Sequence, residues 1–423
     1  MKKLVIPFLL LLASLQTFAS FDQWFVDKTL RVDYYHTGNS QREIYSIDQV
    51  KSEPFWGGSH TEFIDTLNFG EYYFKAFDVA SNKLIFSHGY CALFDEWQYT
   101  DEAKHTSRTF SETVVMPFPK NNVRIEFYSR NFMGVYEKKF DYTVEVKNYF
   151  ISTERQMVFP VYNALVSGDP ATKIDIVILP EGYTAAEMDR FKADVDKFAS
   201  GLFTFEPFTH NRDKFNISAV MAPSAESGTD IPADKTWKNT ILNSSFYTFD
   251  SERYLMTSDN KSVRNLAANV PYDQIYLLVN STKYGGGSIY NFYSTSVNSN
   301  ASSAKIFVHE FGHGFAALAD EYDDGSTSFN DMYPLNLEPW EPNITTLVKF
   351  ESKWKGMLAA GTLIPTAITE GNEMKLGVYE GAGYVAKGLY RPTPDCMMRT
   401  FRGDKFCPVC TAAIQKMIDF YTK

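Results

Sequence analysis

Residues 308–322 read Val308-His309-Glu310-Phe311-Gly312-His313-Gly314-Phe315-Ala316-Ala317-Leu318-Ala319-Asp320-Glu321-Tyr322. The first part of this stretch places two histidines four residues apart, with a glutamate directly after the first. In a helix, such positions lie on one face about one turn apart, so His309 and His313 can bind one metal ion. Glu310 then lies beside that face, where its carboxylate can accept a proton from a metal-activated water. The spacing predicts a helix that carries a metal site.

The residues around the histidines favour the same helix. Ser302 or Ser303 can cap its start. Phe307, Phe311 and Phe315 recur at helical spacing, which predicts that the face opposite the histidines is buried. A helix that only filled a core would more naturally carry apolar residues at the two histidine positions. We therefore favour metal binding over a pair of buried structural histidines.

A catalytic zinc site needs a third protein ligand and an open position for water. Along an unbroken helix, Asp320 would lie about 10 Å beyond His313, at 1.5 Å rise per residue. Asp320 can share the metal only if the helix ends near Ala316 or Ala317. We expect Ala316 to take the left-handed turn, at a cost of about 1 kcal/mol that metal binding offsets. The alternative third ligands are Glu338, Glu341 and Glu351.

The C-terminal segment 394–399, Pro-Asp-Cys-Met-Met-Arg, suggests the base of this site. In metzincin peptidases, the helix breaks soon after the second histidine, and a methionine occupies a tight turn beneath the metal. Met397 or Met398 fits that position, and a closing helix is predicted from about Pro408 to Tyr421. The alternative is an ordinary buried methionine.

The sequence before the metal motif predicts a mixed α/β domain over residues 151–423. An almost continuous apolar run at 174–179 predicts a central strand. Thr184 and Glu187 form a capping box ahead of a helix with an apolar stripe from Met188 to Leu202. Further strands are predicted near residues 215–221 and 274–279. The glycines at 285–287 form either a simple turn or the edge of a cleft that a substrate backbone approaches closely.

Residues 21–150 differ from the rest of the chain. Short segments with partial alternation of apolar and polar residues predict an antiparallel β-sandwich. These segments are residues 30–35, 72–77, 123–128 and 142–146. We favour a packing role for this domain. The alternative is a surface- or carbohydrate-binding role through exposed Trp24, Trp56 and Trp97.

Length, charge and the N-terminal sequence limit the classes of protein to which the chain can belong. The 423 residues suffice for two or three domains. Together with the predicted β-sandwich and α/β domain, this length indicates an α+β multidomain protein. The formal net charge of -10 and the lack of a basic cluster argue against nucleic-acid binding. Residues 1–20 have the charged start, short apolar run and small-residue end of a signal peptide. We expect an exported bacterial protein (periplasmic, cell-surface or secreted) without a stable membrane span.

The four cysteines are Cys91, alone, and Cys396, Cys407 and Cys410, close together. Because export permits disulfides, we expect a local disulfide from Cys396 to Cys407 or Cys410. A second metal site is the less favoured interpretation, since no second pair with ligand spacing follows.

From about residue 151 to its C-terminus, the chain resembles the IgA-peptidase-like metallopeptidases, or igalysins, which are grouped with the metzincins. The resemblance rests on residues 175–183 (Asp-Ile-Val-Ile-Leu-Pro-Glu-Gly-Tyr), 224–230 (Ser-Ala-Glu-Ser-Gly-Thr-Asp), 309–322 and 396–410. It implies a zinc (Zn2+) endopeptidase acting on protein or peptide substrates. The implied ligands are His309, His313 and Asp320, and Glu310 is the implied catalytic acid/base.

Two functions therefore remain open at this point. The favoured one is a secreted zinc metalloendopeptidase in which substrate lies extended along a sheet edge. Tyr322 either helps to hold the oxyanion or packs behind the ligands. The alternative is a non-catalytic exported binding module for host protein or glycan, with a structural or relict zinc site. A structural site would have four protein ligands rather than three.

Overall fold

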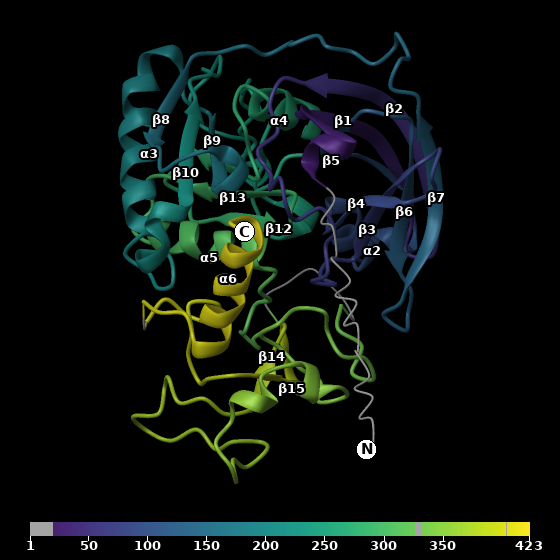
Figure 1. Cartoon of the computed structure of the whole chain (residues 1–423). Coiled ribbons are helices and arrows are strands. Elements are labelled where there is room, and N and C mark those ends of the chain that lie inside the picture. Colours follow the sequence, from purple (N-terminus) through teal and green to yellow (C-terminus); the bar gives the residue numbers. More distant parts are fainter. Residues whose placement is uncertain (1–19, 326–331, 403) are drawn as a thin grey trace, which may run out of the picture.

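The computed structural model describes residues 20–325, 332–402 and 404–423. The predicted signal segment, residues 1–20, lies outside the described residues except for Ser20. A single-turn helix α1 (Phe21–Trp24) opens the described chain. Two antiparallel sheets follow (Figure 1), with the strand orders β2-β1-β5 and β4-β3-β6-β7. Their strands are β1 (Phe25–Gly38), β2 (Glu43–Glu53), β3 (Tyr72–Asp78), β4 (Leu84–Tyr90), β5 (Arg108–Pro119), β6 (Val123–Arg130) and β7 (Tyr136–Val144).

The two sheets pack face to face, as the alternating pattern predicted. Tyr34 of β1 meets Phe127 of β6 edge to face, with ring centroids 5.0 Å apart. Three of the predicted segments lie inside β1, β3 and β6, whereas the fourth runs beyond β7, which ends at Val144. The expectation of exposed tryptophans is wrong for Trp97, which lies in the short helix α2 (Leu93–Gln98) and is fully buried. Its ring packs on Phe110, so it serves the core of this domain.

The second part of the chain is built on a six-stranded mixed sheet, ordered β12-β13-β11-β9-β10-β8. Its strands are β8 (Val161–Leu165), β9 (Ile174–Glu181), β10 (Phe215–Val220), β11 (Gln274–Val279), β12 (Gly286–Ile289) and β13 (Tyr293–Val297). Strands β9, β10, β11 and β13 run parallel, and β8 and β12 are antiparallel edges. Every residue of β9 is buried, because β9 has neighbours on both sides and the faces are covered, as its apolar run predicted.

Helices α3 (Met188–Leu202), α4 (Asn260–Ala267), α5 (Ser303–Ala316) and α6 (Pro408–Tyr421) surround this sheet. Helix α5 lies against β12 and β13 and also contacts α3 and α6. Its phenylalanines are buried as predicted, and Phe307 stacks on Tyr276 of β11 at 4.0 Å. The hairpin of β14 (Tyr379–Ala382) and β15 (Val385–Arg391) lies below the sheet in Figure 1, beside the lower end of α6.

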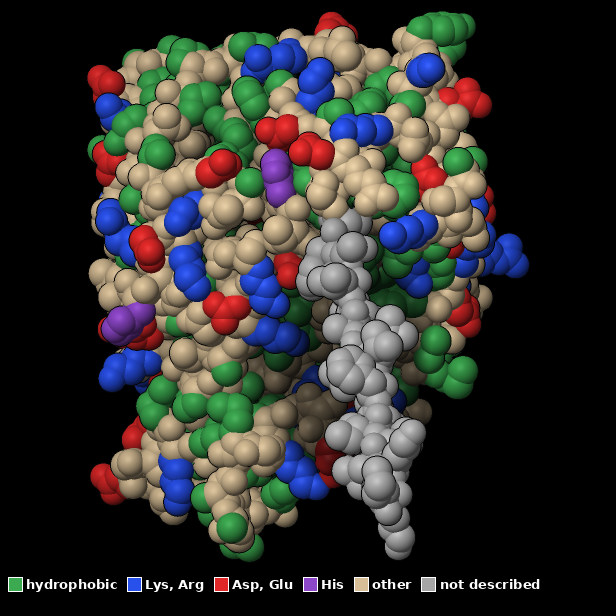
Figure 2. All heavy atoms as spheres, in the orientation of Figure 1, with side chains coloured by type: hydrophobic (Ala, Val, Ile, Leu, Met, Phe, Trp, Pro, Cys, Tyr) green, Lys and Arg blue, Asp and Glu red, His purple; other side chains and the backbone are tan. Residues whose placement is uncertain are grey.

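Two further observations concern the helices and the distribution of surface charge. Among the described residues, no helix has both the length and the apolar composition needed to cross a bilayer. On the face drawn in Figure 2, basic side chains are interspersed with acidic ones rather than gathered in one patch.

Candidate active site

The end of α5 determines where Asp320 lies. The helix ends at Ala316, as predicted, but the left-handed residue is Ala317, with φ of 56°, and not Ala316. The expected position was therefore wrong by one residue. Ala317 donates its N–H to the carbonyl of His313 at 3.1 Å, which closes the last turn. The chain then folds back, so that Asp320 returns to the histidine face of the helix.

His309, His313 and Asp320 converge on one point. The two Nε2 atoms lie 3.1 Å apart. Asp320 Oδ1 lies 3.2 Å from Nε2 of His309 and 3.4 Å from Nε2 of His313. A tetrahedral ion with bonds of about 2.0–2.1 Å separates its ligand atoms by about 3.3 Å. The three atoms are thus spaced as three corners of one coordination tetrahedron.

Backbone carbonyls orient both imidazole rings. Nδ1 of His309 donates to the carbonyl of Met397 at 3.0 Å, and Nδ1 of His313 donates to that of Leu318 at 2.5 Å. Donation through Nδ1 leaves the lone pair of each Nε2 directed at the shared point, which is the usual arrangement of histidine ligands. Met398 packs its sulfur against Gly312 of the motif, where an added Cβ would lie 3.0 Å from it. Met397 therefore provides a carbonyl and Met398 the apolar base.

Asp320 is held by two tyrosines. Its Oδ2 accepts hydrogen bonds from Tyr322 at 2.8 Å and from Tyr384 at 2.7 Å. Its Oδ1 is buried and accepts no hydrogen bond among the described residues. An anionic oxygen left without a donor beside two imidazole lone pairs fits a cation, and a metal suits this donor set. Tyr322 thus positions the carboxylate, the second of its two predicted roles, and Arg253 in turn donates to Tyr322 at 2.8 Å.

The electrostatics of the cluster reflect this convergence. Burial lowers the pKa of His313, but the adjacent Asp320 carboxylate outweighs burial and raises this pKa to about 9. Burial raises the pKa of Asp320, but the histidines outweigh it and hold that pKa well below its ordinary value. Burial also raises the pKa of Glu310, opposed by His309 and His313. A carboxyl with a raised pKa beside the ligand cluster suits the transfer of a proton.

Glu310 lies directly against the edge strand β12. A Cβ built on Gly286 would come within 2.9 Å of Glu310 Oε1. Any side chain at this position would displace the carboxylate, so the glycine run belongs to the cleft edge rather than to a simple turn. On the outer side of β12, Gly286 already pairs with residues 253–255, through Leu255 N–H to Gly286 O at 3.1 Å and Gly286 N–H to Arg253 O at 3.2 Å. Within the described ranges, no backbone hydrogen bond reaches the outer side of β12 beyond Gly286.

The site opens into a cleft of ≈ 1620 Å³. One wall comes from the N-terminal sandwich, including Glu71, Glu96 and Arg130. Glu96 of α2 accepts a hydrogen bond from Tyr254, and burial raises its pKa to about 8. The sequence carries no signal for this wall, because its residues lie far from the metal motif along the chain.

The alternative third ligands lie elsewhere. Glu338 and Glu341 line the cleft, but neither belongs to the histidine cluster, and Glu341 accepts a hydrogen bond from Tyr333 at 2.9 Å. Glu351 is exposed and pairs with Lys355. Sequence reasoning missed Tyr384 and Asn343, which fix the turn around Asp320. Asn343 lies in an irregular segment and Tyr384 in the turn between β14 and β15, so no periodicity marks either residue.

A helix with the His-Glu-x-x-His motif beside the edge of a mixed sheet is the arrangement of a metal-dependent peptidase. The family model described as IgA Peptidase M64 matches residues 163–374 and 368–418, and that described as Peptidase M64 N-terminus matches residues 20–141. Since these matches span most of the chain, the protein belongs to the M64 family of peptidases, and the resemblance seen in the sequence is confirmed. No curated protein matches the chain.

Proposed function

We propose that this member of the peptidase family is an exported zinc-dependent endopeptidase that hydrolyses peptide bonds of protein substrates. The observation that carries the proposal is the convergence of His309, His313 and Asp320 on one point of the cleft, with Glu310 alongside. Three protein ligands leave one tetrahedral position open, which supports catalysis over a structural or relict site. The N-terminal signal pattern supports export.

A zinc ion held by His309, His313 and Asp320 would polarise the scissile carbonyl and lower the pKa of water toward about 7. The residues of the chain supply the other parts of the reaction. Glu310 accepts the proton of the attacking water and passes it to the leaving amine. Tyr322 and Tyr384 hold Asp320 in place through its Oδ2.

The cleft can orient an extended substrate. Ser288 and Ile289 of the edge strand β12 line the cleft beyond the paired Gly286. We expect the substrate backbone to add to this free part of the edge. The wall formed by the N-terminal sandwich would then contact substrate side chains and contribute to the cleavage preference.

The replacement Glu310→Gln tests the chemical role. We expect about 10²–10⁴-fold slower hydrolysis of a mixed protein substrate, because proton transfer is lost while the ligands stay intact. Zinc content, measured by mass spectrometry of the metal, should remain that of the wild type. The exposed Glu351→Gln is the control and should hydrolyse normally. Unchanged hydrolysis by Glu310→Gln at full metal content would refute the assigned role.

A further inference from the structure

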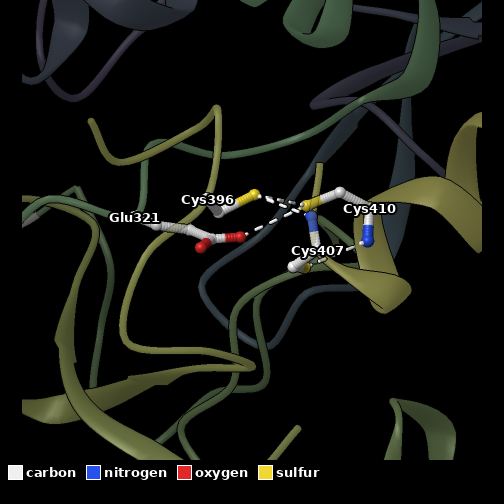
Figure 3. Close-up of side chains that lie close together, drawn as sticks. All are labelled: Glu321, Cys396, Cys407 and Cys410. Atoms are coloured by element: carbon white, nitrogen blue, oxygen red, sulfur yellow. Dashed lines mark hydrogen bonds between the residues drawn. The ribbon is translucent and has the colours of Figure 1, made fainter. Parts of the chain in front are cut away.

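A second cluster of ligand-type side chains lies behind the first. Glu321, Cys396, Cys407 and Cys410 point toward one another (Figure 3), and one ligand atom from each lies within 4.8 Å of the others. All four are buried, with at most 2% exposure. They come from three separate places: the turn after α5, the methionine turn and the start of α6.

The spacing of the sulfur atoms differs from that of a disulfide. Sγ of Cys396 and Sγ of Cys410 are 3.7 Å apart, whereas a disulfide requires about 2.05 Å. All four cysteines of the chain are free thiols, so the local disulfide expected from the sequence is not found in the structure. Zinc–sulfur bonds of about 2.3 Å place two sulfurs of one tetrahedron about 3.8 Å apart. The observed separation matches a shared metal ion.

The carboxylate of Glu321 gives an independent indication of a cation. Glu321 is fully buried, and its Oε2 has no hydrogen-bond partner among the described residues. No lysine or arginine side chain in the described ranges forms a salt bridge with it. Its Oε1 accepts from Asn343 at 3.0 Å and lies 3.2 Å from Sγ of Cys410. Arg391 offsets part of the charge of this carboxylate, but from beyond salt-bridge distance. A buried carboxylate without a direct ion-pair partner is costly, and a metal ion between it and the sulfurs would lower that cost.

The backbone favours thiolates at the same place. Cys407 caps the start of α6, and Cys410 lies in its first turn, where the helix dipole stabilises negative charge. The N–H of Cys407 donates to Sγ of Cys396 at 3.2 Å, and that of Cys410 donates to Sγ of Cys407 at 3.4 Å. Such donors are typical neighbours of metal-bound thiolates.

We propose that Glu321, Cys396, Cys407 and Cys410 form a closed, four-ligand zinc site that fixes the catalytic turn. Four protein ligands in a buried tetrahedron define a structural site, without an open position for water. Three thiolates favour zinc over magnesium or calcium, which prefer oxygen ligands. Each thiol loses its proton to solvent when the ion binds.

The proposed cysteine site lies where it can position residues of the histidine site. Glu321 follows Asp320 directly, and its N–H donates to the carbonyl of Met398 at 2.8 Å. Cys396 precedes Met397, whose carbonyl orients His309. An ion bound to Glu321 and Cys396 would hold the turn with Asp320 and the turn beneath His309 at a fixed separation.

The test uses the full chain loaded with cobalt(II) in place of zinc, under reducing conditions. We expect thiolate-to-cobalt charge-transfer absorption in the wild type and in His313→Ala, because the first site contains no sulfur. Cys407→Ser should lose this absorption together with one metal equivalent per chain. The variant Cys91→Ser, with its change in the N-terminal sandwich, should keep both the absorption and the metal equivalent.

A second measurement uses no variant, so its result does not depend on whether a variant folds. Zinc X-ray absorption on the unmodified chain should show sulfur neighbours at about 2.3 Å. A spectrum with nitrogen and oxygen neighbours alone would overturn the proposal. So would a disulfide between Cys396 and Cys410 in protein purified from its exported location.

Discussion

Asp320 and Glu321 are neighbours in the chain, yet their side chains serve two different clusters. Asp320 joins two histidines at the floor of a cleft, where the side chains of His309 and His313 are 12% and 15% exposed. Glu321 joins three cysteines in a cluster with at most 2% exposure. One cluster has three ligand-type side chains and access to solvent, and the other has four such side chains and no access. One short turn therefore contributes a side chain to each cluster. We propose that the cysteine cluster holds the histidine cluster in place.

Treatment with a chelator should separate the two clusters most strongly. The open site has an exposed position at which a chelator can bind, whereas the closed site has none. We expect 1,10-phenanthroline to abolish hydrolysis while removing one of two zinc ions, with little change in melting temperature. Added zinc should restore activity. Simultaneous loss of both ions with unfolding would contradict the distinction between open and closed sites.

Asn343 connects the two clusters, and its removal should weaken both. Its side chain accepts from the N–H of Ala319 at 2.7 Å and donates to the carbonyl of Ala319 at 2.8 Å and to Glu321. For Asn343→Ala we expect metal affinity to fall about 10–100-fold, and the free energy of unfolding to fall by about 1–3 kcal/mol. Zinc titration and denaturant unfolding measure these changes. Exposed Asn336→Ala is the control, and equal effects in both variants would disprove the link.

The smallest effect concerns the turn between the helix and Asp320. Ala316 and Ala317 are both buried, but only Ala317 has a left-handed conformation. Glycine should therefore be tolerated at 317 and unfavourable in the helix at 316. We expect Ala317→Gly to be more stable than Ala316→Gly by about 1–2 kcal/mol in denaturant unfolding. The reverse order would place the left-handed residue at 316.

Much of the fold could be predicted from local patterns. The continuous apolar run of β9 and the apolar stripe of α3 are both visible in the local sequence. In the structure, the residues that form these patterns are buried. The helix that carries His309 and His313 was predictable for the same reason. The turn was misplaced by one residue, because two consecutive alanines have the same local preference, and only the position of Asp320 distinguishes them.

The sequence indicated three members of the second cluster but favoured a disulfide among them, because metal spacing in a sequence usually appears as two close pairs of ligands. Here only Cys407 and Cys410 form such a pair, Cys396 lies in a turn 11 residues before Cys407, and Glu321 comes from a distant turn. Glu321 lies 75 residues before Cys396 in the numbering, inside a motif already assigned to the first site. The supporting residue Tyr384 lies 64 residues after Asp320 in the sequence, and the β14–β15 hairpin brings it to the carboxylate.

Counting zinc ions in Asp320→Asn and Glu321→Gln tests the comparison most directly. The wild type should hold two ions per chain, and each variant one. Asp320→Asn should lose hydrolysis by at least about 100-fold and keep most of its melting temperature. Glu321→Gln should keep the catalytic zinc and lose about 3–5 kcal/mol of stability, because the buried ion pair is broken. If no ion binds at the cysteines, an amide replaces the buried carboxyl at little cost. A Glu321→Gln variant with wild-type zinc content and unchanged or raised stability would contradict the division of the two residues between two metal sites.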